Sequence, residues 1–301
     1  KDYYNDYRKS LFAYTYCKGG WDCLRHYEII ANRCIPYFLD LDACPHNSLL
    51  TFPKDLVLKS MQELDEGTLT FEKYRNYLMQ IFSHARLNMT CISAAKYFIN
   101  KMAQRNNHSN HLNSKPKVLM INVGSVNYSR ETLSIGLIQY LGSNYTDFPR
   151  NRNLYDGNEF TYTGVVSDKE MDRSNIKKNI QAKEYDYIVI ANIDHGAKLK
   201  LSKIPFWRVI LKNYDMSKIA FIFGGDQSPC VNSSSCPTGE TLQYFLQYGV
   251  CFVRESYDSF EGLAMADWPR FAEIRKSQWE RKIKMISNHP TAKVDWLPNY
   301  C

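Results

Sequence analysis

Residues 18–38 read KGGWDCLRHYEIIANRCIPYF, and this stretch determines the fold expected for the first part of the chain. Two glycines lead into apolar residues at helical spacing, and a short apolar run follows. The pattern predicts a glycine loop, a helix capped by Asp22, and then a buried strand. Free backbone N–H groups at such a helix start bind anions, most often phosphate. The stretch therefore predicts an anion site at Gly19 and Gly20.

The predicted helix has two different sides. One side holds Trp21, Arg25, Glu28 and Asn32. A cation near the phosphate and a carboxylate farther along suit a nucleotide, with Arg25 at the diphosphate and Glu28 at the ribose. The same spacing also fits a buried helix on which Arg25 and Glu28 form only a salt bridge. A second side, mostly apolar and suited to face a sheet, holds Leu24, Tyr27, Ile30 and Ala31.

The composition is that of an ordinary globular protein, with 44% hydrophobic and 23% charged residues. A length of 301 residues fits two domains of ordinary size. The net charge of +7 comes from scattered basic residues, which suits a small anionic substrate and gives only weak support for nucleic-acid binding. No apolar run is long enough for a membrane segment. Among nine cysteines, Cys230 and Cys236 fit either a disulfide or two free thiols.

Changes in pattern divide the chain. Residues 105–116 lose all apolar periodicity and end in Lys-Pro-Lys, which indicates a linker. Residues 117–255 alternate strands and helices, and this alternation predicts a doubly wound parallel sheet in an α/β fold. Residues 1–104 hold only two clear strands, too few for a stable parallel sheet. Either strands lie upstream, or the tail at 256–301, which contains a predicted helix, returns to complete the first domain.

Individual elements follow from periodicity and capping. Strands are predicted at 11–16, 34–39, 118–123, 185–191, 219–223 and 248–253, with a short one near 147–150. Helices are predicted at 55–64, 71–85, 91–102, 130–141 and 205–212. Thr90 is expected to cap the third of these helices.

Several motifs together carry a resemblance that covers most of the chain. They are KGGWDCLRHYEI with the following AN and CIPYF, then CP at 44–45, PK at 53–54, VLMIN, DFPR with LY, FTYTG, YDYIVI, IAFIFGGD and FVRE. This set resembles exostosin-like glycosyltransferases, notably the group found in large DNA viruses and algae. The resemblance implies the GT-B arrangement, two Rossmann-like domains that face each other across a cleft. It also implies metal-independent chemistry in which a nucleotide-diphosphate sugar is the donor and no further cofactor is used.

The resemblance implies a donor-binding role for residues of the opening stretch. The family's helix Arg and Glu fall on Arg25 and Glu28, which would hold the diphosphate and the ribose, and its phosphate loop falls on Gly19 and Gly20. Trp21 fits either beside the donor or in the core. This chain departs from the family in two ways. The donor half comes first, which suggests a circular permutation or a piece of a tandem protein. Arg33 replaces the usual glycine at the helix end, so Asn32 is expected to take the left-handed turn.

Inverting glycosyl transfer requires a carboxylate or His that takes the proton of the acceptor hydroxyl. The candidates near strand ends are Asp226, Asp194, His195 and, less favoured, Asp168. Asp226 is the first choice because it follows Gly224 and Gly225 at the end of a predicted core strand, although a loop carboxylate that caps a helix is the commoner role. Arg254 and Glu255, after the last strand, fit either ligand binding or a charge pair.

Three functions are consistent with these patterns. The favoured one is a hexosyl- or pentosyltransferase that moves a sugar from a nucleotide-diphosphate sugar to a glycan or to a protein-linked hydroxyl. The second is a non-catalytic module that binds a sugar or a nucleotide sugar, since no single base stands out. The third, a protein directed to nucleic acid, rests only on the net charge of +7.

Overall fold

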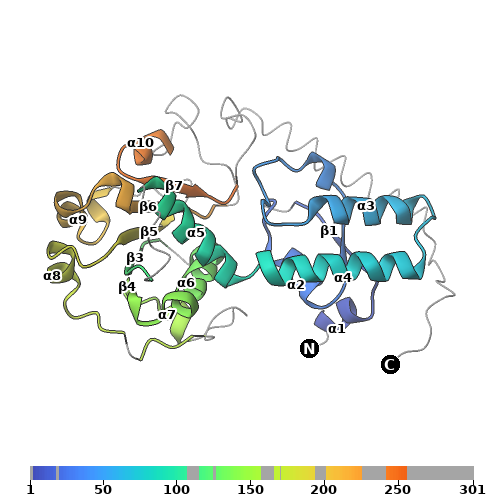
Figure 1. Cartoon of the computed structure of the whole chain (residues 1–301), viewed down its shortest axis with the longest axis horizontal. Coiled ribbons are helices and arrows are strands. Elements are labelled where there is room, and N and C mark those ends of the chain that lie inside the picture. The colour runs from blue at the N-terminus through green and yellow to red at the C-terminus, as the bar shows by residue number, and fades with distance from the viewer. Residues whose placement is uncertain are drawn as a thin grey trace.

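The computed structural model describes residues 3–17, 20–106, 115–124, 127–156, 166–169, 171–193, 201–225 and 242–255. These residues form two lobes, which Figure 1 shows side by side. The predicted tail at 256–301, most of the predicted linker, and the pair Cys230 and Cys236 lie outside the described residues. Among the helices that are described, none is both long and apolar enough to cross a membrane.

The first lobe contains a small parallel sheet covered by helices. Its elements are α1 (Tyr3–Arg8), β1 (Phe12–Thr15), α2 (Leu24–Ala31), β2 (Ile35–Phe38), the short turn η1 (Leu41–Ala43), α3 (Lys54–Asp65) and α4 (Phe71–Asn88). β1 and β2 run parallel, with Phe12 opposite Ile35. Every residue of β2 is buried, because α2 and α3 both pack near it. The predicted strands and helices of this region are thus confirmed.

The second lobe contains a five-stranded parallel sheet. Its elements are α5 (Cys91–Arg105), β3 (Val118–Asn122), α6 (Tyr128–Leu141), η2 (Gly142–Asn144), β4 (Tyr145–Phe148), α7 (Arg152–Tyr155), α8 (Ile176–Gln181), β5 (Tyr187–Ile193), η3 (Leu201–Lys203), α9 (Trp207–Asn213), η4 (Met216–Lys218), β6 (Ile219–Phe223), α10 (Leu242–Leu246) and β7 (Val250–Val253). The strand order is β4-β3-β5-β6-β7, and all pairs are parallel.

This strand order is typical of doubly wound α/β sheets. Counted along the lobe, it is 2-1-3-4-5, and the direction of winding reverses between β3 and β5. Ligands of such sheets bind outside the carboxyl ends of the strands at this reversal. The prediction of an α/β protein with a parallel sheet is confirmed, and the sheet is compatible with a Rossmann-like fold.

Helix α5 precedes the predicted linker, yet it packs in the second lobe. Its side chains Phe98 and Met102 belong to the same buried core as Val118 of β3. Figure 1 shows α5 beside α6, across from α4 in the first lobe. The close approach depends on Gly136 of α6, where an added Cβ would lie 1.9 Å from the carbonyl oxygen of Cys91. The chain therefore passes from the first lobe to the second between α4 and α5.

The ends of α2 differ from the sequence prediction at two residues. Asp22 does not cap the helix; Cys23 occupies the N-cap position and makes no side-chain cap bond. At the other end Arg33, with a φ of +61°, takes the left-handed conformation that was expected of Asn32. Asn32 stays near the helical region because its side chain donates to the Glu28 carbonyl (2.9 Å) and accepts from Arg8 Nε (3.0 Å). The cap of α5 is as predicted, since the Thr90 hydroxyl accepts from the Ser93 N–H.

Candidate functional site

The two lobes meet where strands of both sheets end. In the first lobe, the chain leaves β1 and reaches Asp22 before α2 begins. In the second lobe, Arg254 and Glu255 directly follow β7. The Asp22 backbone N–H donates to Glu255 Oε1 at 2.7 Å, and the Ser48 hydroxyl donates to Glu255 Oε2 at 3.3 Å. One carboxylate of the second lobe thus binds two segments of the first.

Two tyrosines complete this group. The Tyr27 hydroxyl donates to Asp22 Oδ1 at 2.9 Å, and the Tyr128 hydroxyl of α6 donates to the Asp22 carbonyl oxygen at 3.3 Å. The Arg254 guanidinium carbon lies 5.1 Å from the centre of the Tyr128 ring, a cation–π distance. We call these residues the interlobe cluster; its members are Asp22, Tyr27, Ser48, Tyr128, Arg254 and Glu255.

Burial controls the ionisation of the cluster. Glu255 is only 3% exposed, and burial raises the pKa of its carboxyl to about 7, although the Asp22 N–H and Arg254 oppose the shift. Burial also raises the pKa of Asp22, although the neighbouring Tyr128 and Tyr27 hydroxyls favour the carboxylate and oppose the shift. The pKa values of Tyr27 and Tyr128 lie well above their usual range for the same reason. Both hydroxyls therefore remain protonated and act as donors.

The interlobe cluster borders a cavity of about 1220 Å³ between the lobes. Its walls include Asp22, Leu24 and Tyr27 of the first lobe and Tyr128 and Arg254 of the second. This interlobe cavity is somewhat larger than the usual range for small-molecule sites, about 300–1,000 Å³. The structure thus brings together the predicted helix start, through Asp22, and the predicted strand end at Arg254 and Glu255.

The other described residues predicted to hold a donor, Gly20, Trp21, Arg25 and Glu28, are not in the walls of this cavity. Gly20 and Trp21 are buried. The Arg25 guanidinium lies 6.0 Å from the centre of the Tyr16 ring. Glu28 Oε1 accepts a hydrogen bond from the Tyr4 hydroxyl of α1 at 3.0 Å. The predicted Arg25–Glu28 side of α2 is therefore turned toward α1, and the side expected to face a sheet supplies Leu24 and Tyr27 to the cavity.

His26 holds the end of the glycine loop and was not singled out from the sequence. Its ring is fully buried, and burial lowers its pKa to about 4, so the ring is neutral. Because the Trp21 carbonyl can only accept, Nε2 donates to it (3.0 Å), and Nδ1 accepts from the Thr15 hydroxyl (2.9 Å). The signal for this role was its spacing of three and four residues from the buried Ile29 and Ile30.

The predicted bases Asp226, Asp194 and His195, like Gly19, lie outside the described residues. The described chain does fix the start of the segment that leads to Asp226. The Asn127 side chain caps α6 and donates from Nδ2 to the Gly224 carbonyl at 2.9 Å. An added Cβ at Gly224 would lie 2.3 Å from Asn127 Oδ1, so a larger residue here would displace the Asn127 side chain from its position as the α6 cap. Asp226 remains a prediction for the same sheet edge, where β6 ends.

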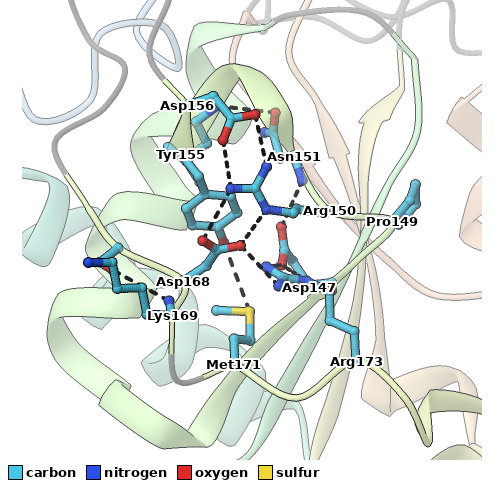
Figure 2. A network of polar contacts seen from close by, with 12 residues as sticks. Asp147, Pro149, Arg150, Asn151, Tyr155, Asp156, Asp168, Lys169, Met171 and Arg173 are labelled. Carbon is cyan, nitrogen blue, oxygen red and sulfur yellow. Dashed lines mark hydrogen bonds and ion pairs between the residues drawn. The ribbon is translucent and has the colours of Figure 1, made fainter.

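Asp168, the weaker candidate base, belongs to a different structure, a chain of ion pairs at the carboxyl end of β4 (Figure 2). It pairs with Arg150 at 2.7 Å and with Arg173 at 3.0 Å. The hydrogen bond from Arg150 is the largest of the effects that lower its pKa. Arg173 also donates to the buried Asp147 at 2.9 Å. A carboxylate held in this way is a weak base, and the structure gives Asp168 a role in holding Arg150 and Arg173 near the end of β4.

A network of this kind explains the DFPR and LY motifs without a ligand. The guanidinium carbons of Arg150 and Arg173 each lie 5.4 Å from the centre of the Tyr155 ring. Asp156 forms the outer end of the network, 2.7 Å from Arg150.

Among the described residues, then, the interlobe cluster with its cavity is the strongest candidate site. No family model, no curated protein and no solved structure matches this chain.

Proposed function

We propose that this chain is a glycosyltransferase that binds a nucleotide-diphosphate sugar between its two lobes, in a GT-B arrangement with the halves in permuted order. One observation carries the proposal. The segment between β1 and α2 in one sheet's lobe meets the segment after β7 of the other sheet at the contact between Asp22 and Glu255, beside a cavity of about 1220 Å³. Carboxyl ends of strands are where α/β sheets bind ligands. Two such edges around one cavity suit a donor on one side and an acceptor on the other.

Two features of the cavity suit a leaving diphosphate. Arg254 lies in the wall, and α2 begins at Leu24, also in the wall, without a side-chain cap. Uncapped N–H groups and a fixed cation stabilise negative charge that develops on a leaving group. In this proposal Gly19, Gly20 and Arg254 hold the diphosphate, and the base is Asp226, Asp194 or His195.

Arg25 and Glu28 keep the roles that the resemblance implies if the nucleotide reaches past the cavity walls to the α1 side of α2. The Tyr4 hydroxyl now donates to the Glu28 carboxylate, so a ribose hydroxyl would have to replace it. Tyr4→Phe removes this competitor and leaves the ring in place. If Glu28 binds the ribose, Tyr4→Phe strengthens nucleotide binding; if Glu28 serves only to hold α1, the variant leaves binding unchanged.

The test is a thermal-shift series with nucleoside diphosphates such as UDP and GDP. A ligand at about 100 times its Kd stabilises the folded state by about 2.7 kcal/mol, which raises the Tm by several degrees. Arg254→Ala, Arg25→Ala and Glu28→Ala are expected to remove the shift, and Arg254→Lys to retain part of it. Arg75→Ala, on the exposed side of α4, is the control. A shift that survives all three alanine variants contradicts the site.

A second assay separates the enzyme from the binding module. The glycosyltransferase hydrolyses or transfers the sugar of its donor, and variants of the true base abolish this turnover while the thermal shift remains. Binding with no turnover of any nucleotide sugar, in the presence of glycan and peptide acceptors, would favour the non-catalytic module.

A further inference from the structure

Part of the interlobe cavity is a groove that follows strand β7. It is lined by every residue from Gly249 to Arg254 and by one side of α5, from Thr90 to Arg105. At 1.5 Å per residue, that side of α5 is about 22 Å long. The groove begins at the interlobe cluster, where β7 ends, and extends past the amino end of β7 to Met216 and Leu246.

The groove lies along the edge of the sheet. β7 pairs with β6 on one side, and no strand within the described residues pairs with its other edge. All four residues of β7 are half-buried. The walls contain consecutive residues of this strand, from both of its faces, so the cavity follows the edge itself. Such an edge presents backbone N–H and C=O groups that can pair with another strand.

The side chains around this edge are apolar and exposed. Four large ones line the groove with 47% to 63% of their surface accessible: Leu50, Tyr97, Met216 and Leu246. An alkyl chain would cover them, but it would leave the backbone groups of the edge dehydrated and unpaired, which costs free energy. An extended peptide covers the same side chains and also pairs with the strand. The combination favours a peptide.

Charge gives the peptide a direction. Lys101 and Arg105 lie on the last turns of α5, at the end of the groove far from the interlobe cluster. Asn106 fixes this end, since its side chain donates to the Ser217 carbonyl at 2.8 Å. Among the described residues of the walls, the acidic one is Asp22, which lies at the opposite end. Acidic side chains of a ligand are therefore attracted to the Lys101 end.

We propose that an extended peptide binds in this groove as an additional strand on β7, with acidic residues at Lys101 and Arg105 and apolar residues on Tyr97 and Leu246. At about 3.3 Å per residue, roughly seven residues span the groove. The other end of the peptide then lies at Asp22 and Arg254. Its identification as the acceptor, with a Ser or Thr hydroxyl at that end, rests on the proposed function; its binding does not.

The test uses the full chain and a fluorescent eight-residue peptide that begins with two Glu residues and continues with alternating Val and Ser. Fluorescence anisotropy is expected to show saturable binding without any nucleotide. The double variant Lys101→Glu, Arg105→Glu weakens binding about tenfold, since each attraction becomes a repulsion. Lys96→Glu, an exposed change on another side of α5, is the matched control and leaves binding unchanged.

A second peptide tests the strand pairing. It has the same sequence with alternate backbone nitrogens methylated, and it is expected not to bind because it lacks the N–H groups that pair with β7. Equal binding of both peptides, or no effect of the double variant, overturns the proposal. Dodecyl phosphate that displaces the peptide while methylation has no effect would identify a lipid groove instead. A positive result in a chain that shows no nucleotide shift keeps the peptide site and removes only the acceptor role.

Discussion

Arg33 shows how a single residue departs from its expected conformation. Its φ of +61° is in the left-handed region, which costs a residue with a side chain about 1–2 kcal/mol. The guanidinium lies 5.9 Å from the centre of the Phe82 ring, a contact that offsets part of this cost. Asn is one of the few residues that tolerate the left-handed region, whereas β-branched residues do not.

We therefore expect Arg33→Asn to raise the free energy of unfolding by about 0.5 kcal/mol and Arg33→Val to lower it by about 1 kcal/mol. Urea unfolding measures both. Arg75→Asn, inside α4, is the control and should be destabilising because Asn is a poorer helix former. If Arg33→Asn and Arg75→Asn change the free energy of unfolding in the same direction, the left-handed conformation of Arg33 is not the cause of its change.

Glu255 links the stability of the fold to pH. Burial raises its pKa from 4.5 to about 7, so between these values the folded chain keeps a proton that the unfolded chain releases. The contribution of Glu255 to stability is thus fully present below pH 4.5 and is lost as the pH rises through about 7. The shift corresponds to about 3 kcal/mol.

Glu255→Gln removes the charge, and its amide oxygen can accept from the Asp22 N–H while its NH2 group donates to the Ser48 hydroxyl. We expect this variant to be more stable than the wild type at pH 8, with a difference that shrinks toward pH 5. Urea unfolding of both proteins at the two pH values measures the change. If the difference in stability between the variant and the wild type grows toward pH 5, attraction to Arg254, and not burial, determines the pKa of the Glu255 carboxyl.

At the scale of elements, the contact between α5 and α6 depends on one missing side chain. Gly136→Ala would place a Cβ 1.9 Å from a backbone oxygen of α5, and backbone cannot move aside cheaply. We expect this variant to lose about 3 kcal/mol of stability. Gln139→Ala, an exposed change three residues later in α6, should have almost no effect. Thermal unfolding of the two variants distinguishes close packing from a general effect of alanine.

The sequence predicted the helices and strands better than it predicted which of them pack against one another. The strands at 118–123 and 219–223 were clear because buried parallel strands are continuous apolar runs. The apolar side of α5 showed that this helix packs against something, but periodicity does not say which sheet. The rotation of α2 was misjudged for a related reason, since His26 is buried as a neutral, doubly hydrogen-bonded ring and does not look apolar in a sequence.

The candidate site was predictable only in part. Arg254 and Glu255 could be placed after a strand, and Asp22 before a helix. Their contact joins residues 233 positions apart, and no local pattern records such a distance. The hydrogen bond from Tyr4 to Glu28 could not be predicted from the sequence either, because it depends on how α1 packs across α2. The chemistry of each segment could be predicted from the sequence, and the contacts between distant segments could not.

At the scale of the molecule, the two lobes have separate buried cores and meet through a small polar contact. Glu255 accepts from both Asp22 and Ser48, and Tyr128 donates to Asp22. Glu255→Ala removes the acceptor that the two first-lobe donors share. We expect scanning calorimetry to show two separate transitions for Glu255→Ala, and a single one for the wild type and for Glu255→Gln. One transition in all three proteins would mean that other contacts couple the lobes.

The same variant tests whether a nucleotide contacts both lobes. A ligand that binds only at the glycine loop raises the Tm of the first lobe alone, because only a state that binds the ligand is stabilised. A ligand held by α2 and by Arg254 requires both lobes to be folded and is released when the less stable lobe unfolds, so UDP is expected to raise the lower transition of Glu255→Ala until it merges with the upper one into a single transition. Two transitions that stay separate at saturating UDP, with one of them raised past the other, would place the nucleotide in a single lobe and would contradict an interlobe donor site.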